Sequence, residues 1–169
     1  HDELMEQFRT HDQNPHPTPK EFSAPILFNC IPQIGSFDDQ GFTSEEKKVM
    51  NETKKILRIP EARISAFTVR VPVLNAHAET VWVTLKKEAN REQVVGAMVH
   101  GEGLVIDQDA RKFPTQRQVS GQDPVYVGRI HQDVAEPRTW MMWVVSDNIR
   151  KGAALNGIQI AERIEAFWA

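Results

Sequence analysis

Two side chains that can do chemistry stand close together in a strand-like stretch of this sequence, the segment 67–83, FTVRVPVLNAHAETVWV. Arg70 carries a planar guanidinium whose N–H groups match the shape of a carboxylate. His77 carries an imidazole, whose ordinary pKa of about 6.5 allows it to accept or donate a proton near neutral pH. On the residues alone, these roles compete with structural ones, and a histidine at the start of a strand is more often structural.

The elements that must position these two side chains follow from the hydrophobic pattern. Alternating valines in the segment 67–73 predict a half-buried strand, with Arg70 pointing away from its apolar face. After a short break, apolar residues at positions 81, 83 and 85 share the phase of His77 and predict a second strand. The sequence therefore places the guanidinium in one strand and the imidazole at the start of the next.

The rest of the chain mixes strands and long helices without regular strand–helix–strand repeats, which indicates an α+β fold. We expect a mixed, mainly antiparallel sheet covered by helices. Large aromatic residues in the later strands should form much of the core or an interface. Polar residues and prolines between 11 and 20 predict an extended connection after an opening helix. Further strands are expected at about 25–31, 104–107, 125–130 and 139–145, and helices at about 43–58, 90–99 and 149–167.

Composition excludes several classes of protein. The 169 residues carry a formal net charge of −3 with scattered basic residues, which argues against nucleic-acid binding. No apolar run approaches the roughly 20 residues of a membrane span, so we expect no membrane association and a cytoplasmic location. The single cysteine, Cys30, has no partner for a disulfide or zinc site, and we expect it to be a small buried strand residue. The other histidines lack metal-ligand spacing, so no metal site is predicted; they are His11, His16, His100 and His131.

Four separated blocks of the sequence together resemble one family. They are FNCIPQIGSFDDQGFTSEEKKVMNETKKIL, ISAFTVRVPVLNAHAETVWVTLKK, YVGRI and VVSDNIRKGAALNGIQIAE. In this order and spacing they are similar to the C-terminal domain of aspartate-semialdehyde dehydrogenase. The resemblance implies a fold like the C-terminal domains of aspartate-semialdehyde and glyceraldehyde-3-phosphate dehydrogenases, with residues 1–169 forming one substrate-binding and dimerisation domain, of which 1–24 are a remnant helix and linker.

The resemblance also implies roles for individual residues. His77 matches the acid–base histidine of the family, and Arg70 matches the arginine that binds the α-carboxylate of the substrate. Glu45 and Lys48 match the residues that meet the substrate ammonium and the phosphate, respectively. Their spacing of three residues places them on one face of a helix, where a simple surface ion pair is the alternative interpretation. Asn148 matches a position near the nicotinamide of the cofactor, with helix N-capping as the alternative.

A one-residue shift in the SEEKK motif would transfer the two helix roles to Glu46 and Lys47. We choose Glu45 and Lys48 because Arg70 and His77 then fall at the expected distances downstream.

The resemblance implies an NADP-dependent oxidoreductase that converts L-aspartyl 4-phosphate to aspartate 4-semialdehyde and phosphate, in lysine, threonine and methionine biosynthesis. The nine glycines contain no G-x-G-x-x-G motif, because Ile106 stands where the third glycine after Gly101 and Gly103 should be. The nucleotide-binding domain and its catalytic cysteine are thus expected to be absent, NADP to be bound mainly elsewhere, and the isolated chain to be an inactive homodimer. The alternative is a non-catalytic dimerisation module from a paralogue that has lost the nucleophile.

Overall fold

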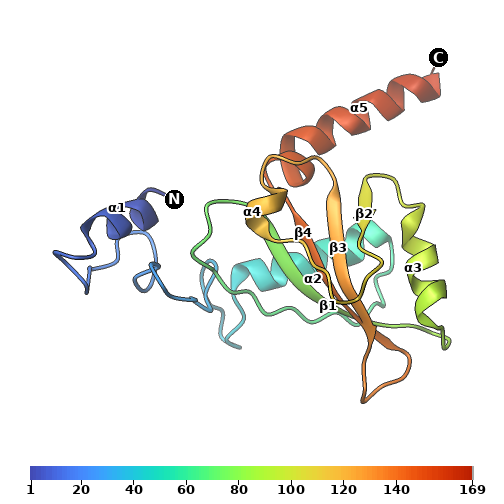
Figure 1. The fold of residues 1–169 in the computed structure, drawn as a ribbon, viewed down its shortest axis with the longest axis horizontal. Helices are drawn as coiled ribbons and strands as arrows, with labels where there is room; N and C mark the ends of the chain where they lie inside the picture. Colours follow the sequence, from blue (N-terminus) through green and yellow to red (C-terminus); the bar gives the residue numbers. More distant parts are fainter. Residues whose placement is uncertain (169) are drawn as a thin grey trace. The chain divides into compact units, whose positions relative to one another are not determined.

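The computed structural model describes residues 1–168, which divide between Pro72 and Val73 into two compact units. Unit 1 contains the helices α1 (Asp2–Thr10) and α2 (Ser44–Leu57), and unit 2 contains the sheet and the remaining helices (Figure 1). Each unit is described separately below.

In unit 1, helix α1 holds the segment that follows it through two buried polar side chains. The carboxylate of Glu3 accepts the backbone N–H groups of Lys20 and Glu21 at 3.0 and 2.6 Å. Gln7 donates to Glu3 at 2.9 Å, and its side-chain oxygen accepts the N–H of Ile26 at 3.0 Å. These bonds replace the sheet pairing that the segment lacks. The small apolar core of this unit consists of Leu4, Ile26 and Ile31.

Helix α2 begins and ends where the sequence predicts. Thr43 is its N-cap in a capping box: the Thr43 hydroxyl accepts the Glu46 N–H, and the Glu46 carboxylate accepts the Thr43 N–H. At the other end, Arg58 adopts a left-handed conformation with φ 55°, and its N–H caps the last turn.

The strands expected at 25–31 and 67–73 are not present. The two segments share a single bridge, in which Ile31 and Arg70 exchange backbone hydrogen bonds of 2.9 and 2.8 Å. The apolar face expected for 67–73 is not buried either, since Val69 and Val73 are 40% and 39% exposed. Prolines at positions 25, 32 and 72 lack the N–H donors that would extend pairing on both sides of the bridge.

The missing strand at 25–31 also changes the environment of Cys30. We expected it to be buried in a strand, but it is an exposed free thiol next to the bridge. Without a strand there is no sheet face to cover its side chain.

Unit 2 contains the four-stranded sheet, in the order β1-β4-β3-β2. Its pairs are antiparallel except β2 with β3, which are parallel, so the predicted α+β fold with a mixed, mainly antiparallel sheet is confirmed. The strands are β1 (His77–Thr84), β2 (Leu104–Ile106), β3 (Val125–Gln132) and β4 (Thr139–Ser146). The helices are α3 (Arg91–Val99), α4 (Gln116–Val119), the π-helical turn Arg150–Ala154 and α5 (Leu155–Trp168).

One face of this sheet is covered by α3 and forms the main core. Val95 of α3 packs with Val127 and Ile130 of β3 and with Trp140 of β4, and all four are buried. Side chains alternate along β4, so its even-numbered residues face α3 and its odd-numbered residues face the opposite side. The sequence correctly indicated aromatic residues in this core.

The opposite face carries aromatic side chains that remain partly exposed. Trp82 of β1 lies directly across from Met141 of β4 in the register, and Trp82 is 57% exposed. The segment before α4 crosses this face at Gly128, where a Cβ atom would lie 2.9 Å from the carbonyl oxygen of Lys112. The indole of Trp143 donates to the Pro114 carbonyl at 2.8 Å and holds that segment in place.

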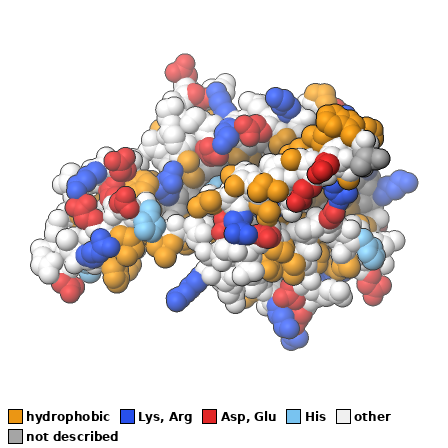
Figure 2. Space-filling model, turned by 90° about the horizontal axis from the view of Figure 1, so that it is seen from above, with side chains coloured by type: hydrophobic (Ala, Val, Ile, Leu, Met, Phe, Trp, Pro, Cys, Tyr) orange, Lys and Arg blue, Asp and Glu red, His pale blue; other side chains and the backbone are white. Residues whose placement is uncertain are grey.

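Helix α5 extends away from the sheet of its own unit and buries none of its residues (Figure 1). The apolar spacing that predicted this helix therefore meets no core within the described chain. Hydrophobic side chains also remain on the molecular face drawn in Figure 2. None of the helices in residues 1–168 combines the length and the hydropathy that a membrane span requires.

Candidate functional site

The predicted ammonium- and phosphate-binding residues lie in the first turns of α2. The Nζ of Lys48 is 3.4 Å from Oε1 of Glu45, and both side chains are partly open to solvent. The prediction that they share a helix face is confirmed. In this arrangement each charge neutralises the other, and both remain accessible to a ligand that carries charges of both signs.

The neighbouring side chains, Glu46 and Lys47, are bound to other parts of unit 1. The Glu46 carboxylate accepts the backbone N–H groups of Thr43 at 2.7 Å and Thr68 at 2.9 Å, and the residue is only 4% exposed. Lys47 forms an ion pair with Asp38. The shifted assignment to Glu46 and Lys47 would thus require both side chains to leave these partners, which favours Glu45 and Lys48 as the residues that meet a ligand.

The Thr68 amide, together with the Thr43 amide, holds the pKa of Glu46 below its ordinary value of 4.5. A carboxylate whose pKa is lowered by folding stabilises the fold above its ordinary pKa, and this contribution is lost as the pH falls through the lowered value. We expect Glu46→Gln to lower the urea midpoint of unit 1 at pH 7, and the difference from the parent to shrink below about pH 4.5.

Amide NMR signals of α2, followed during urea titrations at several pH values, would measure this effect. The matched control is Glu45→Gln, which changes the adjacent carboxylate and leaves the capping box intact. An equal loss of stability in both variants, or a difference that does not depend on pH, would contradict the assignment of Glu46 as the anchoring carboxylate.

Arg70 is held at both its backbone and its side chain. Its backbone forms the bridge with Ile31, and its guanidinium carbon lies 5.2 Å from the centre of the Phe22 ring. This distance is within the range of a cation–π contact, which uses none of the N–H groups in a hydrogen bond and so leaves them available for a carboxylate. Sequence reasoning missed Phe22, because nothing in the local pattern connects it with Arg70.

In unit 2, His77 is the first residue of β1 and its side chain is exposed. Its backbone pairs with Ser146, the last residue of β4. The residue before it, Ala76, is buried and adopts a left-handed conformation with φ 69°, which residues with a Cβ atom rarely adopt. The imidazole therefore projects into solvent from a turn whose backbone is tightly defined.

The side chain of Asn148 contacts this same turn. Its Oδ1 accepts the Ala76 N–H at 3.1 Å. It does not cap the following helical turn; that role belongs to Asp147, whose Oδ1 accepts the N–H groups of Ile149 and Arg150 at 2.9 and 3.2 Å. Asp147 is therefore the capping residue, and the alternative role of Asn148 as an N-cap is wrong.

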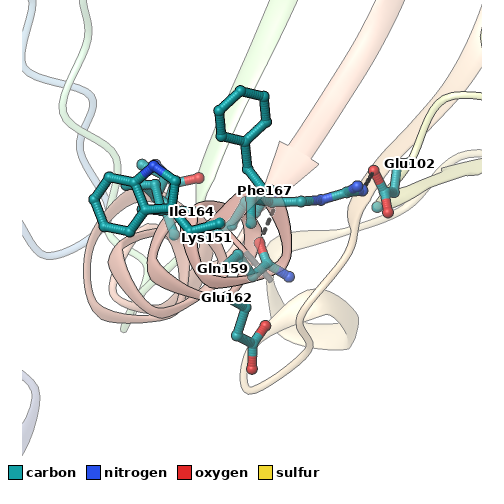
Figure 3. A pocket seen from close by; sticks show the side chains of 11 residues that line it. Glu102, Lys151, Gln159, Glu162, Ile164 and Phe167 are labelled. Atoms are coloured by element: carbon teal, nitrogen blue, oxygen red, sulfur yellow. Dashed lines mark hydrogen bonds and ion pairs between the residues drawn. The ribbon is translucent and has the colours of Figure 1, made fainter.

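A hollow within unit 2 lies elsewhere, along α5 (Figure 3). It is open, measures about 860 Å³, and contains none of the five predicted site residues. Four of its polar side chains form two pairs: Lys151 donates to Gln159 at 2.7 Å, and Arg163 forms an ion pair with Glu102. This hollow shows no group arranged for proton transfer.

No group of histidine, cysteine or carboxylate side chains within residues 1–168 has the arrangement of a metal site. Unit 1 thus carries Glu45, Lys48 and Arg70, and unit 2 carries His77 and Asn148. The mixed, mainly antiparallel sheet of unit 2 differs from the parallel sheet of a dinucleotide-binding domain, so the fold defines a different class of domain.

Comparison with known proteins identifies the family. Residues 1–151 match the family model of the semialdehyde dehydrogenase dimerisation domain. The chain is 45% identical over 142 residues to aspartate-semialdehyde dehydrogenase 2 of Vibrio cholerae and 38% identical over 143 residues to the Bacillus subtilis enzyme, covering 83% of this chain in both cases. This chain belongs to the semialdehyde dehydrogenase dimerisation-domain family.

Solved structures agree with the sequence relatives. A structure of Vibrio cholerae aspartate-semialdehyde dehydrogenase II, solved with ASA, superposes with a TM-score of 0.88 at 42% identity over 95% of this chain and 48% of that chain. A probable aspartate-semialdehyde dehydrogenase from Pseudomonas aeruginosa gives 0.87 at 27% identity, over 99% of this chain and 50% of that one. The chain spans 42% and 41% of the two curated relatives, less than half of their length.

Proposed function

We propose that this chain is the substrate-binding and dimer-forming domain of an NADP-dependent aspartate-semialdehyde dehydrogenase, which converts L-aspartyl 4-phosphate to aspartate 4-semialdehyde and phosphate. The observation that carries the proposal is the family match over residues 1–151, because this range contains all five predicted site residues. The structure of the Vibrio cholerae relative solved with ASA supports the same substrate class.

The substrate carries an α-carboxylate, an ammonium group and a phosphate, and unit 1 offers one group to each. Arg70 binds the α-carboxylate through its guanidinium N–H groups, while the Phe22 ring remains in cation–π contact with the guanidinium. Glu45 binds the ammonium and Lys48 the phosphate, so the ligand replaces the pair that these residues make with each other. Binding therefore exchanges one exposed ion pair, which contributes little stability, for two oriented contacts.

His77 is the proton-transfer group. Its imidazole takes the proton of the cysteine thiol, and the thiolate attacks the acyl carbon of the substrate as the bond to phosphate breaks and phosphate leaves. When a hydride reaches the thioester carbon, the imidazolium stabilises the negative charge on the oxygen by sharing its proton. The C=O bond then re-forms as the C–S bond breaks, and the released thiolate recovers the proton from His77. His77 is exposed at the start of β1, so a reacting group can approach its imidazole from solvent.

This chain offers few groups that could bind the cofactor. The sequence has no glycine-rich loop, and the side-chain oxygen of Asn148 is already engaged by the Ala76 N–H. NADP therefore belongs mainly to a separate nucleotide-binding domain, where it supplies the hydride, and the Asn148 amide nitrogen is the group this chain offers it. A Candida albicans aspartate-semialdehyde dehydrogenase solved with NADP, 27% identical with a TM-score of 0.55 over 84% of this chain and 46% of that one, supports this cofactor.

The activity test compares this chain alone with the chain joined to the remaining half of its Vibrio cholerae relative. We expect no NADP-dependent turnover of aspartate semialdehyde with phosphate by the 169-residue chain, and measurable turnover by the joined protein. Turnover by the isolated chain would contradict the division of labour proposed above. A folded, dimeric but inactive joined protein would instead support the alternative, a dimerisation module without catalytic function.

Dimer formation is proposed to use the sheet face opposite α3. This face has a hollow of about 490 Å³, with Trp82 and Trp143 among its lining residues. Exposed aromatic patches on a sheet are typical of subunit interfaces, and a twofold dimer buries the same patch on both copies.

We expect Trp82→Glu to convert the dimer to a monomer, because it places a charge on this apolar face. Sedimentation velocity over a range of concentrations would measure the change. Val99→Glu is the matched control, since Val99 is an exposed apolar residue in α3, which covers the other face. A dimer that persists in the Trp82 variant and dissociates in the Val99 variant would place the interface elsewhere.

A further inference from the structure

A buried carboxylate next to the predicted base connects three separate parts of unit 2. Asp147 is 3% exposed. Its Oδ1 accepts the N–H groups of Ile149 and Arg150 and caps the helical turn. Its Oδ2 accepts the backbone N–H of Gly121 at 2.7 Å and the side-chain Nδ2 of Asn75 at 3.1 Å. The two oxygens therefore have different roles, one in helix capping and one in holding the chain before β1.

Asn75 and the next residue, Ala76, form the turn that leads into His77. Asp147 holds the Asn75 side chain, and the adjacent Asn148 accepts the Ala76 N–H at 3.1 Å. The left-handed conformation of Ala76 is unfavourable for a residue with a Cβ atom, and such a conformation persists where surrounding contacts determine it. These two contacts, both from the end of β4, supply that determination.

We propose that Asp147 is a positioning residue for His77, acting through Asn75 to fix the turn from which the imidazole projects. The proposal rests on the proposed function of His77 as the proton-transfer group. It goes beyond that function by assigning a role to a side chain that touches neither substrate nor cofactor.

The charges around Asp147 are consistent with this role. The Gly121 amide, followed by those of Ile149 and Arg150, holds the pKa of Asp147 below its ordinary value, so the carboxylate accepts hydrogen bonds at neutral pH. The Arg150 guanidinium is paired with Asp123 at 2.5 Å, on the exposed surface. Asp123 is thus a nearby carboxylate that, like Asp147, contacts Arg150, but it forms no hydrogen bond to Asn75.

The experiment uses three substitutions. Asn75→Ala removes one hydrogen bond to Oδ2 and leaves the helix cap intact, so it remains informative if Asp147→Asn fails to fold. Asp123→Asn is the matched control. Hydrogen exchange of the Ala76 amide is measured in the 169-residue chain, and kcat and KM are measured in the joined protein described above.

We expect Asn75→Ala to accelerate exchange of the Ala76 amide about tenfold and to lower kcat by a similar factor with little change in KM, the scale of one hydrogen bond. Asp147→Asn should produce a larger effect in the same direction, and Asp123→Asn should change neither quantity. A merely structural role would lower the amount of folded protein but leave kcat per folded molecule unchanged.

Wild-type exchange and kcat in the Asn75 variant, together with a strongly impaired His77→Ala variant, would overturn the positioning role while leaving the proposed function intact. A near-normal rate for His77→Ala would overturn the proposed function of His77 itself. The hydrogen bond between Asp147 and Asn75 would then have no role in catalysis. The two failures are therefore distinguishable.

Discussion

Replacing His77 with alanine in an active dehydrogenase containing this chain should lower kcat by about two to four orders of magnitude, the usual contribution of a general acid–base group. Alanine can neither take the thiol proton nor return a proton to the carbonyl oxygen. Because the imidazole is exposed and packs into no core, the substitution should leave the fold intact. Steady-state kinetics on purified protein, with circular dichroism as a check on folding, would measure the effect.

The matched control for this substitution is His100→Ala. His100 is also an exposed histidine of unit 2 and caps the end of α3, on the side of the sheet away from β1. It should retain kcat within about twofold, as expected for a surface residue with no role in proton transfer. If the His77 variant retained a similar rate, this imidazole would have no part in the mechanism.

Arg70→Ala should raise KM for the amino-acid substrate by roughly 10- to 150-fold, corresponding to about 1.5–3 kcal/mol for a hydrogen bond to a charged group. The arginine binds a carboxylate that does not change during the reaction, so its loss should act on binding more than on kcat. Arg70→Lys should recover little of the affinity, since an ammonium keeps the charge but lacks the planar, bidentate geometry of a guanidinium.

Separate titrations of substrate and NADP would test this assignment. Arg63→Ala provides the control, because Arg63 is an exposed arginine of the same unit, outside the predicted site. An effect confined to the KM for NADP would contradict the role of Arg70 as the carboxylate ligand.

Helix boundaries were accessible from the sequence where side chains act locally. Thr43 and Glu46 form a capping box within four consecutive residues, so the pattern alone identifies the start of α2. The same box explains why Glu46 is unavailable to a ligand, an argument that favours Glu45. The short helix α4 is not among the predicted helices, although Thr115 and Gln118 form a similar capping box there.

The predicted strands of unit 1 were wrong because alternating apolar residues were not accompanied by a neighbouring backbone able to pair with them. The valines of 67–73 have the period of a strand, but a strand also needs a neighbouring backbone with free donors, and here that neighbour contains prolines on both sides of Ile31. Unit 1 instead satisfies its backbone through side chains such as Glu3 and Gln7. Local periodicity does not reveal that side chains, rather than a neighbouring strand, bind these backbone groups.

The site shows the same division between local and distant information. Resemblance to a family suggested Arg70, His77, Glu45 and Lys48 as site residues, and helix spacing added only that Glu45 and Lys48 share one face. The contacts that hold these groups are distant in sequence. Phe22 contacts Arg70 across 48 positions, and Asp147 holds Asn75, in the turn before His77, across 72 positions. Only the folded topology brings such residues together.

Helix α5 has a consequence for how the chain unfolds. A single helix of 14 residues is only marginally stable in water, and α5 gains little from burial because none of its residues is fully buried. Its opening therefore leaves the α3-covered core untouched and need not be coupled to it. We expect α5 to open at a lower free energy than the sheet, so a single unfolding free energy does not describe both parts of unit 2.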